Sequence, residues 1–513
     1  MTTIESLAAA PVERWLDDAR DLALRNDLRG AETLLRAAIT RFPGDDEVGV
    51  ALASVCWQRG AHDDARALLR ETLRRQPTHL AAAFALARIE AEQSDFQAAD
   101  EALRRAFTGA AHPSDLALRA AKMLADWGRK PGAVDVCEAA IASGNVDPKL
   151  HLYAAALLGQ IGEFERARER YEFALDHDPT AIEAGAAYGL ATMQRYTDRE
   201  HSDRARFEYA LERSDLADAE RASLLFALGK LHDDLGEFAD AANCLRQANA
   251  LIDHSAWSRR NWRRLVDARL AAKPLPARTP GAEECVPIFV VGAPRSGTTL
   301  VAELLGRSPL VRNRGELDWL PHFAERVANA GRVDVALLDD IAAEYLSKLQ
   351  QGERDARWFV DKQPLNFLHA DLIRALFPQA WIVHSRRNAR DTALSIWCQH
   401  FGSTEYRFAY DFDDIAAVLR GCAKLMAKAA NASGSRVIDV RYEAIAQHPQ
   451  TIVDAVAATI GVPRFDCSRT DERRHAIGTA SLWQARQPVY TASIGRWRAY
   501  AEFVPELMGF SDD

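Results

Sequence analysis

The first half of the chain repeats one pattern of apolar and polar positions at a constant interval. In "RGAHDDARALLRETLRRQP" and "QSDFQAADEALRRAF", a small residue is followed five positions later by an alanine that opens an apolar stripe of helical spacing. The alanine returns every 34 residues, at Ala31, Ala65, Ala99, Ala133 and Ala167. The small residue returns with it, at Gly60, Ser94, Gly128 and Gly162. This pattern predicts pairs of helices that stack along the chain.

A period of 34 residues with two helices in each unit resembles tetratricopeptide repeats. Neither helix of a pair buries its apolar stripe alone, so neighbouring pairs must stack. A further copy at Gly236 and Ala241 follows an irregular stretch, residues 194–216. The alternative is an unrelated helical bundle, and the shared register of five alanines counts against it. Such arrays bind peptides on a concave surface or serve as packing and dimerisation platforms, and the sequence leaves both roles open.

The pattern changes after "AAKPLPARTPGAEE", residues 271–284, whose three prolines prevent helix continuation and predict an interdomain linker. Beyond it, helical patterns alternate with short apolar runs at 286–292, 357–361, 380–385 and 436–442. Alternating strands and helices imply a mostly parallel sheet with covered faces. We therefore expect an all-α repeat superhelix over residues 1–270, the linker, and a three-layer α/β domain of the P-loop type over residues 285–513.

Composition adds limits rather than a function. A net charge of −9 counts against a chain-wide nucleic-acid-binding surface, so we expect no nucleic-acid partner. The seven cysteines include no C-x-x-C pair, which indicates reduced thiols and no zinc site. We find no secretory signal and no apolar run of about 18 residues. These features predict a cytoplasmic protein without a membrane span.

The stretch "VVGAPRSGTTL", residues 290–300, has the spacing of a Walker A loop, but Thr298 stands where a lysine would reach the outer phosphates of a nucleotide. A strand, a glycine loop and a helix are the context that a phosphate loop requires. Backbone N–H groups at a helix N-terminus bind an anion without a lysine, and Arg295, Thr298 and Thr299 add donors. The missing lysine suits a nucleotide with a single 5′ phosphate-type group. A nucleotide kinase or ATPase, and a turn without ligand, are the alternatives; no clear metal-holding aspartate after an apolar strand supports the former.

A second anion site is indicated by "HSRRNARDTALS", residues 384–395. Arg387 stands where a strand should end, and Ser395 lies eight residues later in the following helix. Arginine offers planar paired donors to phosphate, and serine adds a hydroxyl. Both would lie at the carboxyl edge of the sheet, where open α/β sheets bind ligands. Taken alone, this spacing is more typical of a solvated helix face.

Together, "PRSGTT" and "RRNARDTALS" resemble the two nucleotide motifs of sulfotransferases that use 3′-phosphoadenosine-5′-phosphosulfate (PAPS), most closely those of the tyrosylprotein sulfotransferase branch. The resemblance covers residues 285–500. It implies that Arg387 and Ser395 clamp the 3′-phosphate, while the 5′-phosphosulfate is cradled by Arg295, Ser296, Gly297, Thr298 and Thr299. It also implies an adenine-contacting tyrosine and a C-terminal loop over the nucleotide, with candidates Tyr442, Ser481, Gln484 and Arg496. Arg496 stands where the animal enzymes have lysine.

The same resemblance matches Glu316, in "NRGELDWL", and Lys362, in "VDKQP", to the acidic and basic catalytic residues of the branch. It implies in-line transfer of a sulfuryl group to an acceptor hydroxyl, with Glu316 as general base and with Arg295 and Lys362 stabilising developing charge. No metal is needed in this scheme. The non-catalytic alternatives are that Glu316 is a surface carboxylate and that Lys362 is solvated or forms a structural ion pair. The other candidate bases are His369, His384 and His400.

The acceptor stays open in the sequence. The branch implies a tyrosine in a peptide or protein, which the repeats would hold, whereas a sugar, a lipid or a small phenol would also supply a hydroxyl. A non-catalytic repeat scaffold is the remaining reading of the whole chain, although it leaves the joint presence of Arg295, Glu316 and Lys362 unexplained.

Overall fold

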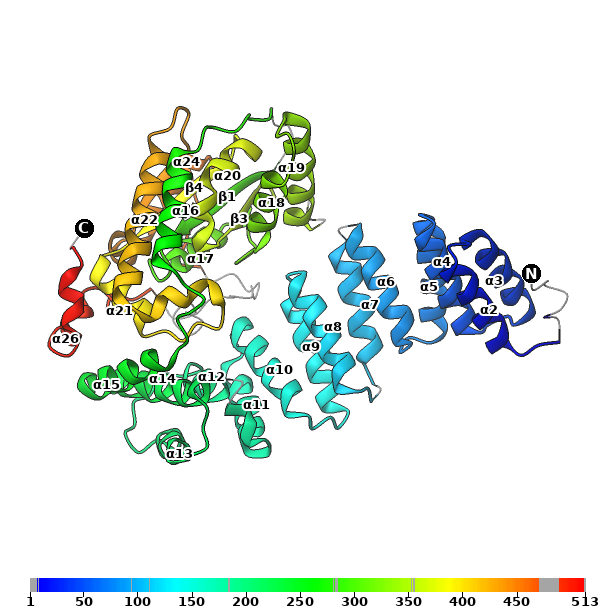
Figure 1. Ribbon diagram of the computed structural model, residues 1–513, viewed down its shortest axis with the longest axis horizontal. Coiled ribbons are helices and arrows are strands. Elements are labelled where there is room, and N and C mark those ends of the chain that lie inside the picture. The colour runs from blue at the N-terminus through cyan, green and yellow to red at the C-terminus, as the bar shows by residue number, and fades with distance from the viewer. Residues whose placement is uncertain are drawn as a thin grey trace. The chain divides into compact units, whose positions relative to one another are not determined.

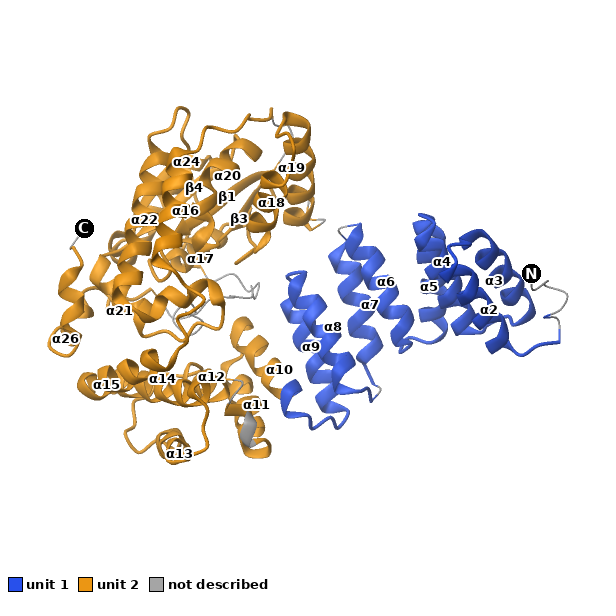
Figure 2. Cartoon of the chain, viewed as in Figure 1, with its two compact units in different colours: residues 1–150 blue, residues 151–513 orange. Residues whose placement is uncertain are grey.

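The chain forms two compact units, Met1–Leu150 and His151–Asp513 (Figure 2). The computed structural model describes residues 7, 9–93, 95–109, 111–182, 185–279, 281, 285–351, 353, 356–469 and 489–511. Among the described helices, none combines the length and the apolar character that crossing a bilayer requires. All seven cysteines are free thiols.

The first unit is built from helix pairs (Figure 1). Its helices are α2 (Val12–Leu24), α3 (Leu28–Arg41), α4 (Asp46–Gln58), α5 (His62–Arg75), α6 (Leu80–Glu92), α7 (Phe96–Phe107), α8 (Ser114–Asp126) and α9 (Lys130–Ala142). Each pair packs internally, as α2 does on α3 and α4 on α5, and then stacks on the next pair. The stacking buries apolar stripes that one pair could not bury alone.

The recurring small residues have the roles that their spacing predicts. All five recurring alanines are fully buried, so the helices approach closely at these positions: Ala31, Ala65, Ala99, Ala133 and Ala167. The turn residues Gly60, Gly128 and Gly162 have φ of 81°, 75° and 85°, in the left-handed region that favours glycine. Asn26, with φ of 62°, fills the same position one period before Gly60, although it is not a small residue. Ser94 lies outside the described residues.

The second unit opens with further repeat helices, α10 (Pro148–Ile161) and α11 (Phe164–His177). The irregular stretch follows, with short elements in place of a regular pair: η1 (Pro179–Ile182), α12 (Ala186–Ala191) and α13 (Ser202–Leu211). Regular pairing resumes with α14 (Asp218–Asp234) and α15 (Phe238–Leu251). The turn between them has Gly236 at φ of 76°, as in the earlier repeats.

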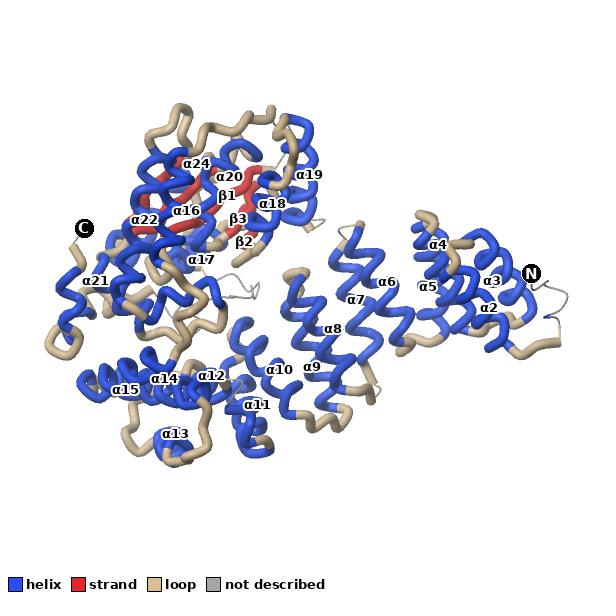
Figure 3. The backbone as a smooth tube through the Cα atoms, viewed as in Figure 1, coloured by secondary structure: helices blue, strands red, loops and turns tan. Residues whose placement is uncertain are grey.

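The rest of the second unit is a five-stranded parallel sheet with the helices that pack on it (Figure 3). Its strands are β1 (Val286–Gly292), β2 (Val311–Asn313), β3 (Trp358–Asp361), β4 (Trp381–Arg386) and β5 (Val437–Arg441), in the order β2-β3-β1-β4-β5. All four pairings are parallel. The four strands expected from the sequence are present, which confirms the predicted fold class. The three-residue strand β2 is too short to give an apolar pattern.

Alternate residues of β1 enter two different apolar cores. Ile288 and Val290 pack with α17 (Thr298–Gly306) and α24 (Pro449–Ile460). Phe289 and Val291 belong to a larger core with residues of α18 (Trp319–Ala328), α19 (Val335–Gln350), α20 (Ala370–Leu376), α21 (Ala389–Trp397) and α22 (Phe412–Ala430). Because successive side chains of a strand point to opposite faces, helices cover both faces of the sheet.

The larger core continues into the last helix pair. Phe226 of α14 and Leu245 of α15 belong to the same apolar cluster as Phe289. Helix α16 (Arg259–Ala271) packs against α22, where Trp262 Nε1 donates to the carbonyl of Ala417 at 3.0 Å. The last repeat pair and the sheet are therefore joined by continuous packing. The division into residues 1–270, 271–284 and 285–513 stays a prediction.

Candidate functional site

The predicted site residues gather at the carboxyl edge of the sheet. β1 and β4 are neighbours, yet the helices that follow them lie on opposite faces, because α17 belongs to one apolar core and α21 to the other. A reversal of this kind opens a crevice at the carboxyl ends of the two strands, where open α/β sheets bind ligands. The loop after β1 and Arg387 after β4 flank this crevice.

The backbone of the loop after β1 is tightly constrained. A Cβ atom on Gly292 would lie 2.4 Å from the carbonyl oxygen of Ser385 on β4, so only glycine fits there. Arg295 has φ of 66°, a conformation that costs free energy for a residue with a side chain and is concentrated at functional sites. Gly297, at φ of 98°, begins α17 without a side-chain cap. The first amides of α17 are therefore not capped by their own N-cap residue.

Ser296 holds the centre of this loop. Its carbonyl accepts a hydrogen bond from Ser385 Oγ at 2.8 Å, and its N–H donates to the carbonyl of Ala293 at 3.1 Å. Its own Oγ is buried and has no partner in the described part of the chain. Thr298 and Thr299 are also buried, in the first turn of α17. The loop is thus fixed through its backbone, while a buried hydroxyl is left for a ligand.

The two sequence motifs meet directly. Arg295 Nε donates to Ser395 Oγ at 3.0 Å, and Arg387 Nη1 donates to the carbonyl of Arg295 at 3.2 Å. The Arg387 guanidinium stacks on the ring of Tyr442, with its carbon 4.7 Å from the ring centre. Its Nε is buried without a partner among the described residues. The side chains expected at the two ends of one nucleotide therefore share one site.

The site carries concentrated positive charge. Burial lowers the pKa of Arg295, and the nearby charges of Arg387 and Arg496 lower it further. Burial likewise lowers the pKa of Arg387, and Arg496 adds to the effect. Both shifts mean that the charged guanidinium is less favourable here than in water. A bound anion would relieve this cost, so the crevice favours an anionic ligand.

Glu316 and Lys362 form an ion pair between the loops that follow β2 and β3. Lys362 is almost fully buried, whereas Glu316 keeps 24% of its side chain exposed. The Lys362 N–H donates to the carbonyl of Gly315 at 2.8 Å, and Gly315 has φ of 73°. Since β2 and β3 are adjacent and parallel, their carboxyl ends bring these two residues to the same edge of the sheet as the loop after β1.

Asp361 is the residue to test against the expectation that no clear metal-holding aspartate follows an apolar strand. It ends the apolar strand β3, where a P-loop ATPase could hold a metal ion. Its Oδ2 accepts hydrogen bonds from the Tyr345 hydroxyl at 2.6 Å and from Asn366 Nδ2 at 3.2 Å. Burial raises the pKa of this fully buried carboxyl to about 7. A carboxyl so enclosed is poorly suited to coordinate a hydrated magnesium ion.

The C-terminal segment lies against the second motif. Arg387 Nη2 donates to the carbonyl of Ser493 at 2.6 Å, and the Tyr442 hydroxyl and Ser493 Oγ are 2.5 Å apart. The Tyr442 ring also packs against Gly297, where an added Cβ atom would lie 2.5 Å from Cδ2 of the ring. Arg496 forms an ion pair with Asp233 of α14. Ser481 and Gln484, the other predicted residues of this loop, lie outside the described residues.

Asp391 is a site residue that the sequence did not reveal. Its Oδ2 accepts from the N–H of Gly495 at 2.6 Å, and its Oδ1 accepts from the N–H of Trp497 at 2.9 Å. It stands inside the second motif, between Arg387 and Ser395. Its partners follow about a hundred residues later, so no local signal could identify them.

Two of the three candidate histidines, His384 and His400, have structural partners. His384 Nδ1 lies 2.8 Å from Asp439 Oδ1, and its Nε2 lies 3.9 Å from Cys422 Sγ. His400 stacks on Phe226 of α14, and burial lowers its pKa to about 4. Burial also lowers the pKa of His369 to about 4. The contacts of His384 and His400 account for these two residues without a proton-transfer role, whereas His369 Nδ1 is buried without a hydrogen-bond partner among the described residues.

Comparisons with known proteins agree with this architecture. Residues 287–466 match the model of the sulfotransferase family, and residues 22–89 match that of the tetratricopeptide repeat. An uncharacterized protein of Aquifex aeolicus is 25% identical over 382 residues, 69% of this chain and 48% of the relative. Protein-tyrosine sulfotransferase 2 of Gallus gallus is 23% identical over 192 residues, 35% of this chain and 52% of the relative.

The chain thus spans about half the length of these curated relatives. Among solved structures, the sulfotransferase domain from the curacin biosynthetic pathway is 16% identical, with a TM-score of 0.27 and coverage of 45% of this chain and 98% of that chain. The two family models confirm the combination expected from the motifs: the chain joins tetratricopeptide repeats to a sulfotransferase domain.

Proposed function

We propose that this protein transfers a sulfuryl group from PAPS to an acceptor hydroxyl. The observation that carries the proposal is the meeting of the two nucleotide motifs at the crevice between β1 and β4. Arg295 contacts Ser395, and Arg387 contacts the backbone of Arg295. PAPS carries negative charge at both ends of one adenosine, so it requires two anion sites within the span of a single nucleotide.

The donors at this crevice fit that ligand. The first turn of α17 and the buried Ser296 hydroxyl suit the 5′-phosphosulfate, because helix N-termini bind anions through backbone N–H groups. The buried Nε of Arg387 and the hydroxyl of Ser395 suit the 3′-phosphate. Thr298 in place of the Walker lysine, together with the enclosed carboxyl of Asp361, argues against a nucleoside triphosphate with magnesium.

The ion pair of Glu316 and Lys362 supports a separate catalytic role for each of the two residues. Glu316 accepts the proton of the acceptor hydroxyl as its oxygen forms a bond to sulfur. The bond between sulfur and the bridging oxygen breaks, which releases 3′-phosphoadenosine 5′-phosphate (PAP) with the bonding electrons. Lys362 stabilises the charge that develops on the bridging oxygen, and Arg295 stabilises the sulfuryl oxygens. The proton on Glu316 then returns to water.

For the acceptor, we propose a tyrosine of a peptide or protein. The support is the name of the Gallus gallus relative, together with repeats of a type that often binds peptides. We further propose that the protein acts in the cytoplasm, since all seven cysteines are free thiols.

A transfer assay with radiolabelled PAPS tests the proposal. We expect label on a tyrosine peptide with the native protein and loss of transfer in the Glu316→Ala variant. The same peptide with phenylalanine in place of tyrosine is the matched control. Label on a small phenol or a sugar, but not on the peptide, would retain the reaction and reject the acceptor. An unchanged rate in the variant would reject Glu316 as the base.

A further inference from the structure

The C-terminal segment is held on both sides of Arg496. On the N-terminal side, the Ser493 carbonyl accepts from Arg387, and the Ser493 hydroxyl contacts that of Tyr442. Both carboxylate oxygens of Asp391 accept from the backbone, one from Gly495 and the other from Trp497. Arg496 therefore projects from a backbone that the second nucleotide motif fixes in place.

The partner of Arg496 comes from the repeats. Asp233, in the last turn of α14, forms an ion pair with Arg496 through Oδ1. The same oxygen accepts from the Tyr500 hydroxyl at 2.6 Å. Only 27% of the Arg496 side chain is exposed. Burial alone disfavours the charged guanidinium, but the nearby Asp233 carboxylate raises the pKa of Arg496 above its ordinary value.

Helix α14 also contacts residues that follow the sheet strands. Phe226 of α14 stacks on His400, with ring centres 4.9 Å apart. On the neighbouring helix α15, Arg246 forms an ion pair with Glu506 at 2.7 Å. These contacts and the shared apolar core leave Asp233 little freedom to move relative to Arg496.

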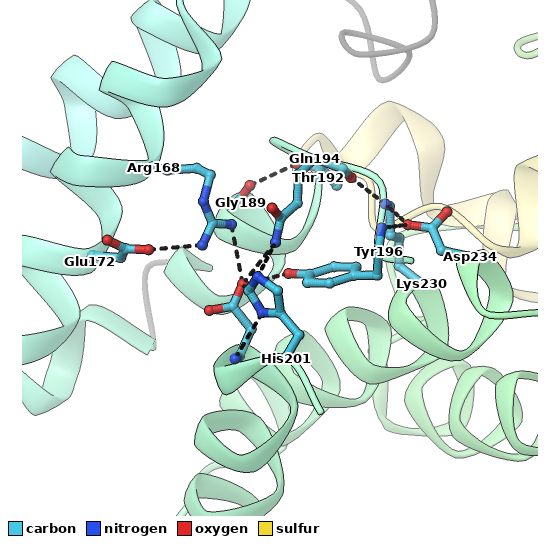
Figure 4. A network of polar contacts seen from close by, with 10 residues as sticks. Arg168, Glu172, Gly189, Thr192, Gln194, Tyr196, His201, Lys230 and Asp234 are labelled. Carbon is cyan, nitrogen blue, oxygen red and sulfur yellow. Dashed lines mark hydrogen bonds and ion pairs between the residues drawn. The ribbon is translucent and has the colours of Figure 1, made fainter. Parts of the chain in front are cut away.

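The next residue, Asp234, is directed toward the repeats. Its Oδ2 accepts from the Tyr196 N–H at 2.9 Å and pairs with Lys230 (Figure 4). The Tyr196 hydroxyl in turn donates to Asp203 at 2.7 Å, and Asp203 pairs with Arg168 of α11 at 3.1 Å. Two adjacent carboxylates of α14 thus have different roles: Asp234 closes the network inside the irregular repeat, and Asp233 reaches Arg496.

We propose that Asp233 is a positioning residue that holds Arg496 in the binding site for PAPS. The last repeat pair, α14 and α15, thereby completes that site. The inference rests on the proposed function. A guanidinium has five N–H donors, so contact with Asp233 leaves donors for a phosphate. Without Asp233, three neighbouring arginines, Arg295, Arg387 and Arg496, would repel one another, and Arg496 would turn away from the site.

Calorimetric titration of the full chain with PAP, combined with transfer kinetics, tests this role. We expect Asp233→Asn to weaken PAP binding about 10-fold to 100-fold, the range for loss of a charge-assisted hydrogen bond. KM for PAPS should rise by a similar factor, while kcat at saturating donor changes little. Asp233→Glu should recover part of the affinity. The matched control, Asp234→Asn, should lower the melting temperature but leave PAP affinity within about threefold.

A reciprocal exchange, Asp233→Arg with Arg496→Asp, serves if Asp233→Asn does not fold. It restores the ion pair but moves the cation onto α14, so we expect a folded protein with weakened PAP binding. Native affinity in the exchanged protein, or in folded Asp233→Asn, would overturn the inference while leaving the proposed function intact. Failure of the native protein to bind PAP would overturn both.

Discussion

Arg295 Nε donates a hydrogen bond to Ser395 Oγ, 3.0 Å away, although a hundred residues separate them in the sequence. The bond joins the loop after β1 to α21, the helix after β4. These elements lie on opposite faces of the sheet and converge only at its carboxyl edge. A ligand anchored on the loop after β1 is therefore within reach of the second motif. This proximity limits the size of the ligand and the spacing of its anionic groups more closely than either motif does alone.

Removal of Arg387 should abolish discrimination between PAP and adenosine 5′-phosphate. We expect Arg387→Ala to weaken PAP binding about 10-fold to 100-fold, because a charge-assisted contact to the 3′-phosphate is lost. Binding of adenosine 5′-phosphate should change much less. Arg386→Ala is the matched control, since that neighbouring side chain is half exposed beside Asp439. Equal losses for both nucleotides in isothermal titration would contradict the assignment.

Neutralising Glu316 should affect chemistry rather than nucleotide binding. We expect Glu316→Gln to lower kcat about 10²-fold to 10⁴-fold, the range for loss of a general base, with PAP affinity within about threefold of native. Glu325→Gln, at an exposed position of α18, should leave both quantities unchanged. A parallel loss of PAP binding would make Glu316 a support for Lys362 instead of a base.

Adding one carbon to Gly297 should damage the loop. Both Gly297 and Gly434 have positive φ, 98° and 68°, so alanine at either position costs about 1–2 kcal/mol in backbone strain. At Gly297 the new Cβ would also lie 2.5 Å from the Tyr442 ring, whereas no atom lies within 4 Å at Gly434. We expect Gly297→Ala to lose more stability in thermal melts and to lose PAP binding. Equal effects of the two variants would argue against close packing of Tyr442.

Acid should weaken the attachment of α14 through His400. Burial lowers the pKa of this histidine to about 4, from an ordinary value of 6.5. Between these two values the unfolded chain binds a proton that the folded chain does not, so stability falls as pH falls from 6.5 to 4. His400→Gln cannot titrate there, and its melting temperature should fall less than that of the native protein over this window. Parallel pH profiles would show that His400 is not buried in the neutral form.

The sequence was sufficient for the parts of the fold that have a period or a local motif. The alanine interval predicted the helix pairs, and β-branched runs predicted four strands. Strand β2 has only three residues, so it gives no pattern, and α16 has an ordinary helical sequence that does not show its packing on α22. Contacts with distant partners, such as Trp262 with Ala417, depend on the tertiary fold.

The residues of the candidate site were predictable where they belong to a short sequence motif. Residue type and spacing predict Arg295 and Arg387, and the resemblance to the tyrosylprotein sulfotransferase branch implies Lys362. Asp233 was not, because nothing in a repeat helix marks an aspartate whose partner lies 263 residues later. The same holds for Asp391, whose partners Gly495 and Trp497 lie about a hundred residues later.

Nucleotide-dependent thermal stabilisation of the native protein tests the central claim most directly. A ligand that binds only the folded state raises the melting temperature, and the rise grows with the logarithm of its concentration relative to its Kd. We predict that PAP raises the melting temperature at micromolar concentration, whereas ATP with magnesium does not. Stabilisation by ATP with magnesium and none by PAP would contradict the account and favour a nucleoside triphosphate site.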